Sequence, residues 1–364
     1  MHIGIDARLI AYRVGGISTY TRQLVQALEK LNPEEKMTIF HSRKAPDVIT
    51  SQFNTAKLMT PPHHRNERSL LSLELFRFRL DVLHSPDFIP PKGGARRHVI
   101  TVHDLTFLHF PQYKDAEARR YYNDQIEMAV QQADHILAVS DATRRDLMDM
   151  LNVPAEKISV QPHGVEERFK PYSPRSLMNL GEWNLPERGY ILHVGTLEPR
   201  KNIPALLDAY DMLRARMPQV PPLLLVGKAG WLFDDTMQRI QSLQAAGVPI
   251  LLRDDIPDSA LPAVYNQAGV LALPSFYEGF GLPALEAMAC GIPVVVSDRS
   301  SLPEVVGSAG ALINPDKPAT LADALQRALT DSVWRQQAVD AGMKQAARFS
   351  WENSARIALS AYRG

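Results

Sequence analysis

Two glutamates frame a glycine-rich turn in the segment from Pro274 to Asp298, PSFYEGFGLPALEAMACGIPVVVSD. Glu278 stands directly before the sequence GFGLP, and Glu286 lies about one turn inside the helix that Pro283 is expected to begin. The N–H groups at a helix start, together with glycines, suit a phosphate, and a carboxylate in the first turns can bind two adjacent hydroxyls. The pattern predicts that the glutamates hold two polyols, one on each side of a phosphate. The alternative for either residue alone is an exposed or dipole-stabilising carboxylate.

Two adjacent cations, Arg200 and Lys201, follow another expected strand in the segment GTLEPRKN. Such a pair is usually solvated surface charge. At a strand end directly before a helix, however, the pair could neutralise a diphosphate and assist its departure in place of a metal ion. We therefore interpret Arg200 and Lys201 as a phosphate site.

Weaker signals follow strands in the first half of the chain. Gly15 and Gly16 precede an expected helix and would let the backbone approach a ligand closely, although a simple tight turn is the alternative. His103, in TVHDLTF, could hydrogen-bond a hydroxyl or assist proton transfer, although a histidine in this position is often structural.

The composition excludes several classes of protein. The 364 residues have a formal net charge of zero, which argues against a nucleic-acid partner. The single cysteine, Cys290, excludes a disulfide framework, and the sequence contains no Asp-x-Asp, P-loop, H-E-x-x-H or G-x-S-x-G motif. Apolar runs are too short for a membrane span, and the N-terminus does not resemble a signal peptide, so we expect a cytoplasmic protein.

Short apolar runs alternate with amphipathic stretches of helical length, as in doubly wound α/β domains with parallel sheets. Helical periodicity is clear at 17–31 and 204–217. The segment 167–189, rich in proline and charge, is expected to link two such domains. The expected strands are 2–6, 37–41, 81–85, 98–104, 135–140, 158–164, 190–195, 222–227, 249–254, 270–274 and 293–298.

Taken together, YEGFGLPALEAMACGIPVVVSD, GTLEPRKN, GGISTY and PHGV resemble the retaining, nucleotide-sugar-dependent glycosyltransferases of family 4 over nearly the whole chain. The resemblance implies the GT-B fold, with two Rossmann-like doubly wound parallel-sheet domains facing across a cleft. An acceptor domain would span 1–170 and a donor domain 171–345, and the helix at 346–364 would cross back to the first domain.

The resemblance also implies roles for the residues singled out above. Glu278 would contact the donor sugar and Glu286 the ribose, while Arg200 and Lys201 would take the diphosphate. His103 would lie near the transferred sugar. The remaining donor-binding positions would be Gly15, Gly16, Asp254, Ile256, Gly279, Phe280, Gly281 and Leu282.

One position departs from the family pattern, because Thr196 stands where many members carry an arginine, and Arg200 is the candidate substitute. The implied reaction retains the anomeric configuration without an enzymic nucleophile. The leaving phosphate would accept the proton of the acceptor while cations stabilise the developing charge, with no metal and no cofactor.

Two rival hypotheses remain. The segment 279–284, GFGLPA, matches G-x-G-x-x-A with Asp298 after the next strand, as in an NAD-dependent oxidoreductase, but it leaves Glu278, Arg200 and Lys201 unexplained. A catalytically silent nucleotide-sugar-binding protein is the other.

The motifs resemble those of bacterial mannosyltransferases of surface-polysaccharide assembly, which implies GDP-mannose as donor, with a UDP-hexose second. The acceptor would be a glycan or a lipid-linked glycan. The stretch 66–80, NERSLLSLELFRFRL, is either an ordinary amphipathic helix or a surface for peripheral contact with the inner face of an anionic membrane.

Overall fold

The computed structural model describes residues 1–12, 15–45, 48–64, 66–113, 116–173, 180–183, 185–186 and 189–364. The chain divides into two compact units, one made of Met1–Gly164 with Phe349–Gly364 and the other of Val165–Arg348. The sequence prediction placed these divisions after residues 170 and 345. The predicted linker, 167–189, falls within the second unit, and its residues 174–179, 184, 187 and 188 lie outside the described part of the chain.

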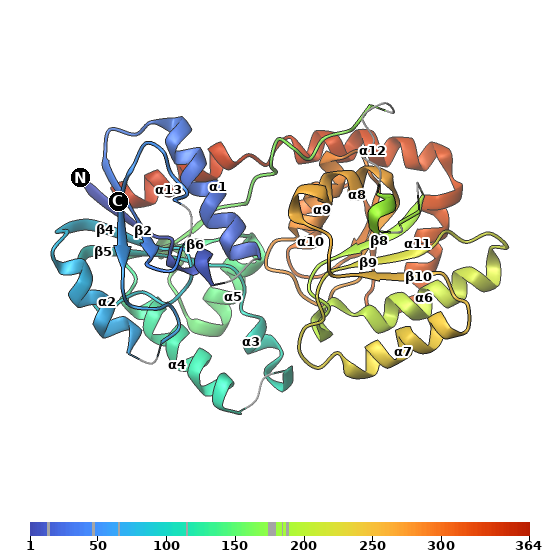
Figure 1. The fold of residues 1–364 in the computed structure, drawn as a ribbon, viewed down its shortest axis with the longest axis horizontal. Coiled ribbons are helices and arrows are strands. Elements are labelled where there is room, and N and C mark those ends of the chain that lie inside the picture. Colours follow the sequence, from blue (N-terminus) through green and yellow to red (C-terminus); the bar gives the residue numbers. More distant parts are fainter. Residues whose placement is uncertain are drawn as a thin grey trace. The chain divides into compact units, whose positions relative to one another are not determined.

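The first unit is built on a parallel sheet, whose strands are drawn in blue to green in Figure 1. Its seven strands lie in the order β3-β2-β1-β4-β5-β6-β7. Strand β1 pairs with β2 on one side and with β4 on the other. The chain order reverses between β1 and β4, so their carboxyl ends border a topological switch point, where open α/β sheets bind ligands. The strands are β1 (His2–Asp6), β2 (Lys36–Ser42), β3 (Asn54–Leu58), β4 (Leu80–Ser85), β5 (Ala95–Val102), β6 (His135–Ala138) and β7 (Ile158–Val160).

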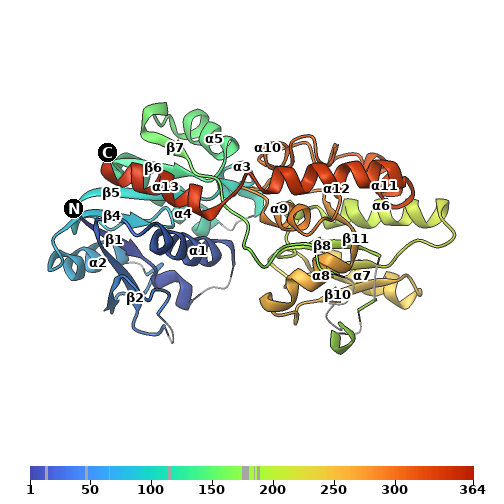
Figure 2. The same cartoon turned by 90° about the horizontal axis from the view of Figure 1, so that it is seen from above.

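Helices cover both faces of this sheet (Figure 2). On β5, Val99 packs into a cluster with α1 and α13, whereas the next residue, Ile100, packs into a cluster with α4 and α5. Burial on both faces explains why the strands read as continuous apolar runs. The helices are α1 (Gly16–Leu31), α2 (Glu67–Phe76), α3 (Thr106–His109), α4 (Ala116–Gln132), α5 (Asp141–Leu151) and α13 (Trp351–Arg363).

A buried hydrogen-bond network fixes α13 against this sheet. Tyr362 Oη lies 2.7 Å from His84 Nδ1, and His84 Nε2 lies 2.8 Å from Thr101 Oγ1. Tyr20 Oη in turn lies 2.8 Å from Thr101 Oγ1 and donates to Gln161 Oε1 at 2.7 Å. These buried polar groups therefore have partners, and the C-terminal helix belongs to the first unit.

The second unit is built on a parallel sheet of six strands in the order β10-β9-β8-β11-β12-β13. The strand order reverses between β8 and β11, which is the switch point of this sheet. The strands are β8 (Tyr190–Val194), β9 (Leu223–Val226), β10 (Ile250–Arg253), β11 (Ala268–Leu273), β12 (Val294–Ser297) and β13 (Ala311–Ile313).

Helices α6, α7 and α11 contribute to the largely aliphatic core on one face of the second sheet. Helix α9 contacts α12 as well as β11 and β12. Among the residues that the structure describes, no helix is both long and apolar enough to cross a membrane. The helices are α6 (Ile203–Arg216), α7 (Asp234–Ala245), α8 (Leu261–Gln267), α9 (Leu282–Ala289), α10 (Leu302–Val306), α11 (Pro318–Thr330) and α12 (Ser332–Ala346).

Candidate active site

Two loops border the switch point of the second unit. The loop after β8 includes a 3₁₀ turn, Pro199–Lys201, directly before α6, and the loop after β11 covers 274–281, directly before α9. The backbone N–H of Phe276 donates to the carbonyl of Arg200 at 2.8 Å, which ties the two loops together. The topology therefore joins segments that lie more than 70 residues apart in the sequence.

The carboxylate of Glu278 lies between two cations at this point. Its Oε1 lies 2.6 Å from Lys201 Nζ, and its Oε2 lies 2.9 Å from Arg200 Nη1. Ser275 Oγ donates to Oε1 at 2.7 Å. Arg200 is also paired through Nε with Glu198 at 2.5 Å. The structure thus brings three of the predicted site residues into one buried ion cluster.

Burial and pairing act in opposite directions on these charges. Burial alone would raise the pKa of Glu278, but Lys201 and Arg200 outweigh it and lower that pKa to about 2. Burial lowers the pKa of Lys201, and the carboxylate of Glu278 works against that change. Glu278 is therefore a carboxylate at neutral pH, fixed as an acceptor for hydroxyl groups that reach it.

Two serines after β12 hold the glycine-rich loop in place. Ser301 Oγ donates to the carbonyls of Glu278 at 2.8 Å and of Phe280 at 2.7 Å, and Ser300 Oγ donates to the carbonyl of Glu278. Gly281 has φ +105°, and a Cβ there would lie 2.7 Å from Leu302 Cδ2. A residue with a side chain would be strained at this position, so glycine is required directly before α9.

Glu286 lies on α9, as the sequence predicts, and is half-buried. Tyr265 Oη donates to its Oε2 at 2.7 Å. Burial raises the pKa of Glu286 to about 8, and the hydrogen bond from Tyr265 only partly opposes this effect. A bound diol that donates hydrogen bonds to Glu286 would favour its ionised form.

Comparison with known proteins places the chain in a family. Residues 14–169 match the family described as Glycosyltransferase Family 4, and residues 181–347 match Glycosyl transferases group 1. The O-antigen chain mannosyltransferase B of Escherichia coli is 34% identical over 372 residues, covering 97% of each chain. The chain belongs to the family 4 and group 1 glycosyltransferases. The enzyme class predicted from the sequence is thereby confirmed.

Other relatives match only part of the sequence of this glycosyltransferase. The D-inositol 3-phosphate glycosyltransferase of Salinispora arenicola is 32% identical over 250 residues, which cover 65% of this chain and 56% of the relative. The serotype-specific mannosyltransferase WbdA of Escherichia coli is 30% identical over 283 residues, which cover 75% of this chain and 34% of the relative.

Solved structures confirm the predicted GT-B fold of the glycosyltransferase. Sucrose-phosphate synthase from Thermosynechococcus elongatus superposes with a TM-score of 0.76 at 24% identity, covering 100% of this chain and 98% of that one. WaaG, a glycosyltransferase of lipopolysaccharide biosynthesis, superposes with a TM-score of 0.76 at 15% identity, covering 100% of both chains. These comparisons give no support to the dinucleotide-binding alternative. The eight residues 274–281 also separate β11 from α9, whereas that motif follows its strand directly.

Three other predicted residues of the glycosyltransferase, His103, Gly15 and Gly16, lie in the first unit. His103 follows β5 in the first unit, where its Nε2 lies 2.8 Å from the carbonyl oxygen of Pro86 and Tyr20 packs edge-on against its ring at 4.9 Å. Burial lowers the pKa of His103, so the ring is neutral at pH 7. Gly15 and Gly16 lie at the start of α1 in the same unit. Their roles stay predictions.

Asp254 and Ile256 follow β10, and in the strand order β9 lies between β10 and β8. Thr196 is exposed, whereas the guanidinium of Arg200 reaches Glu278. That Arg200 takes the place of the arginine that many members carry at position 196 stays a prediction. Within the described residues, no group of three or more His, Cys, Asp or Glu side chains could hold a metal ion.

Several site residues were not found from the sequence. Glu198 and Ser275 complete the ion cluster, and Tyr265 orients Glu286. Glu198 and Ser275 lie within the motifs GTLEPRKN and PSFYEGFGLP, so their closeness in sequence to the predicted residues could have indicated them as site residues. Tyr265 lies 21 positions before Glu286, on α8, and its pairing depends on the packing of α8 against α9.

Proposed function

We propose that this glycosyltransferase transfers a mannosyl group from GDP-mannose to a glycan acceptor with retention of configuration and without a metal ion. One observation carries the proposal: Glu278 is held as a buried carboxylate between Lys201 and Arg200, at the switch point of the second unit. A diphosphate that approaches these cations places its attached sugar beside a fixed acceptor of hydroxyl hydrogen bonds.

The proposed sugar follows from the relatives. The O-antigen chain mannosyltransferase B of Escherichia coli matches over 97% of both chains, and WbdA is also named a mannosyltransferase. A UDP-hexose is the second candidate, because Anabaena HepE, with a TM-score of 0.77, was solved in complex with UDP-glucose. Because one relative is an O-antigen mannosyltransferase, we favour a surface polysaccharide as the acceptor, either attached to a lipid or free.

In the proposed reaction, an acceptor hydroxyl oxygen forms a bond to the anomeric carbon while the bond from that carbon to the diphosphate oxygen breaks. Both events occur on the same face of the sugar, and the hydroxyl proton moves to the leaving phosphate oxygen. Arg200 and Lys201 stabilise the charge that develops on the diphosphate, which is why no metal is required. Glu278 orients the sugar, Glu286 holds the ribose, and His103 hydrogen-bonds the transferred sugar.

Thermal denaturation with a ligand panel tests the donor. GDP, UDP, ADP, GDP-mannose, UDP-glucose and NAD are each added with and without EDTA, because a ligand that binds only the folded chain raises its melting temperature. We expect GDP and GDP-mannose to raise it and EDTA to leave the shift unchanged. If only UDP and UDP-glucose raise the melting temperature, the donor is a UDP-hexose and not GDP-mannose. If EDTA abolishes the rise in melting temperature, the proposal of a site without a metal ion is contradicted.

Two glutamate variants separate the proposed roles. Glu278→Ala should abolish transfer, because the donor sugar loses the carboxylate that orients it, whereas the nucleoside diphosphate should still bind. Glu286→Ala should weaken binding of the nucleoside diphosphate itself. The anomeric configuration of the product, assigned by NMR, tests retention. An inverted product, or full activity in both variants, would refute the assignment.

We also propose peripheral contact with an anionic membrane through α2. Its Leu73 and Phe76 are 75% and 80% exposed, and Arg77 and Arg79, which follow the helix, are exposed as well. Large apolar side chains beside arginines suit the boundary between headgroups and acyl chains. This surface would bring the chain to the inner face of a membrane that carries a lipid-linked acceptor.

Vesicle co-sedimentation tests this surface. The wild type should bind vesicles that contain anionic lipid, and the paired change Leu73→Ser with Phe76→Ser should reduce the bound fraction at least several-fold. Met343→Ser, at a partly exposed position on α12 of the other unit, is the control. Equal binding by the wild type and the α2 variant would refute the contact.

A further inference from the structure

The segment 165–172 of the second unit lies beside Glu286. The side chain of Asn266, on α8, makes two hydrogen bonds to the backbone of this segment, at 2.9 and 2.7 Å. Phe169 is 4% exposed and packs edge-on against the ring of Tyr265, with 5.7 Å between the ring centroids. Tyr265 in turn donates its hydrogen bond to Glu286. The segment is therefore fixed against α8, next to the carboxyl group that we assign to the ribose.

Arg168, in this segment, reaches the loop that follows β10. Its Nε and Nη2 donate to the two carboxyl oxygens of Glu166 at 2.9 and 3.0 Å. Nη2 also donates to Asp258 Oδ2, and Nη1 donates to the carbonyl of Asp258, both at 2.6 Å. The guanidinium lies over the ring of Phe169, 4.7 Å from its centroid. Asp258 begins the 3₁₀ turn that follows the predicted donor-binding positions in 254–256. Arg168 thus ties the end of this donor-binding loop to its own segment.

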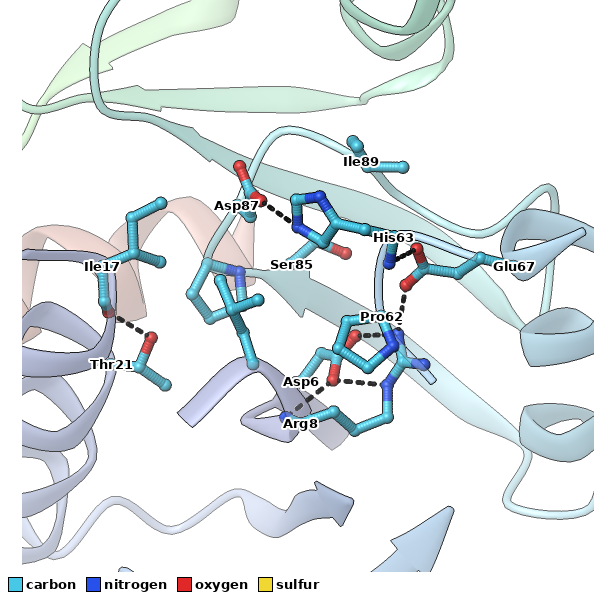
Figure 3. Close-up of a pocket in the computed structure, with 12 residues that line it drawn as sticks. Asp6, Arg8, Ile17, Thr21, Pro62, His63, Glu67, Ser85, Asp87 and Ile89 are labelled. Atoms are coloured by element: carbon cyan, nitrogen blue, oxygen red, sulfur yellow. Dashed lines mark hydrogen bonds and ion pairs between the residues drawn. The ribbon is translucent and has the colours of Figure 1, made fainter. Parts of the chain in front are cut away.

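A second arginine between two carboxyl groups shows what a purely structural arrangement looks like. In the first unit, Arg8 is paired with Asp6 and Glu67 (Figure 3). The side chain of Arg8 is 1% exposed, as expected of a contact that holds the fold together. The side chain of Arg168 is 29% exposed and that of Asp258 is 67% exposed. Because an ion pair this open to solvent contributes little to stability, stabilisation of the fold does not account for Arg168.

Charged groups around Glu286 act on its carboxyl group in opposite directions. Burial is the largest effect and raises the pKa of Glu286, and the charges of Asp258 and Glu166 raise it further. The hydrogen bond from Tyr265 and the positive charge of Arg168 lower it. Arg168 therefore offsets the two acidic side chains that it binds, and it favours the carboxylate form of Glu286.

The other elements that pack against α9 meet it through uncharged groups in the contacts described. Strands β11 and β12 contain no charged residue. Helix α12 meets α9 at Gly342 beside Met288, and Leu302 of α10 lies beside Gly281 at the start of α9. The thiol of Cys290, directly after α9, stays neutral because burial raises its pKa. The charge of this carboxyl group is therefore governed from the side of α8 and of the segment 165–172.

We propose that Arg168 is a positioning residue of the donor site, which holds the loop after β10 in place and offsets the acidic neighbours of Glu286. A carboxylate accepts hydrogen bonds from two adjacent ribose hydroxyls, and Arg168 stabilises that form of Glu286. The inference rests on the proposed function, in which Glu286 holds the ribose, and it adds a residue to that site. Binding of a nucleoside diphosphate should depend on Arg168 most strongly below about pH 8, where Glu286 must lose a proton when the ribose binds.

Calorimetric titration of GDP, UDP and ADP into the full chain, between about pH 7 and pH 9.5, tests the inference. At pH 7, Arg168→Gln should bind the accepted nucleoside diphosphate about 3- to 10-fold more weakly than the wild type, as the loss of one nearby charge implies. The ratio of the two dissociation constants should decrease toward pH 9.5, because Glu286 is then ionised in both proteins. This ratio cancels the titration of the nucleotide itself. Arg168→Lys keeps the charge and should make the ratio independent of pH, whereas Asp258→Asn should reverse its slope.

Arg239→Gln is the matched control, because Arg239, on α7 of the same unit, is 36% exposed and pairs with Asp208 at 2.6 Å. It should bind the nucleotide as the wild type does at every pH. Unchanged binding by Arg168→Gln, or binding weakened by the same factor at every pH, would overturn the inference while the proposed function stands. Equal slopes for the lysine and glutamine variants would overturn it as well. If the wild type binds none of the three nucleotides, the proposed function itself fails, and the assignment of Arg168 to a donor site is overturned with it.

Discussion

Replacing Glu278 by glutamine removes one buried charge while nearly preserving the shape of the side chain. The ion pairs of Glu278 give the expected loss of stability. Lys201 and Arg200 lower the pKa of this carboxyl from its ordinary 4.5 to about 2. At about 1.36 kcal/mol per pKa unit, this corresponds to roughly 3–4 kcal/mol of stabilisation at neutral pH. The loss of one partner from a buried ion pair independently costs about 3–5 kcal/mol. Both routes predict a substantial loss of stability in the second unit.

Calorimetric unfolding at pH 7 measures this loss. For a unit of this size, about 1 kcal/mol shifts the melting temperature by roughly 2–4 °C, so we expect Glu278→Gln to lower the transition of the second unit by about 7–14 °C. Glu352→Gln is the control, because its ion pair with Arg356 is exposed on both sides and should contribute less than about 0.5 kcal/mol. A nucleoside diphosphate should stabilise the variant more than the wild type, since its phosphates replace the lost charge.

The pH dependence gives a second check on the same reasoning. A carboxyl whose pKa is lowered by folding contributes stability that is complete above its ordinary pKa and disappears as the pH falls through the folded value. The difference between wild type and Glu278→Gln should therefore be constant above about pH 5 and shrink toward pH 2. A variant that melts within about 2 °C of the wild type at pH 7 would show that the cluster does not hold this loop.

Three further changes have defined expectations. Burial raises the pKa of Glu286 to about 8, so its carboxyl group destabilises the folded state increasingly as the pH rises from 4.5 to 8. Glu286→Gln should therefore be more stable than the wild type at pH 9, by roughly 1–3 kcal/mol in thermal unfolding. The same variant should bind nucleotide more weakly. Gly164→Ala places a Cβ 2.1 Å from the backbone nitrogen of Trp351 and should cost the first unit more than about 2 kcal/mol in urea unfolding. Gly281→Ala, at φ +105° and 2.7 Å from Leu302, should cost about 1–3 kcal/mol and weaken GDP binding in a titration.

The strands of both sheets were largely predictable because their apolar runs are continuous. Each run that predicted a strand corresponds to one of the observed strands, with ends that differ by a few residues. Two strands were missed. Strand β3, NTAKL, is mostly polar and exposed at the sheet edge, and β13 has only three residues. Edge strands bury less apolar surface, so their sequences carry a weaker signal.

The candidate site was predictable only in part, for a topological reason. Arg200, Lys201 and Glu278 could each be found because they follow strands, but the sequence does not state that β8 and β11 are neighbours. The distances of 2.6 and 2.9 Å to Glu278 result from that adjacency.

The two switch points occupy equivalent places in their sheets, between the first strand of the unit and its fourth, yet their charges differ. In the second unit, the two cations Arg200 and Lys201 are paired with the carboxylates of Glu198 and Glu278, so the formal charge of the cluster is zero. In the first unit, one cation, Arg8, is paired with the carboxyl groups of Asp6 and Glu67. Since the attraction of a phosphate depends on the local sum of charge, one fold used twice presents different electrostatic environments at its two switch points.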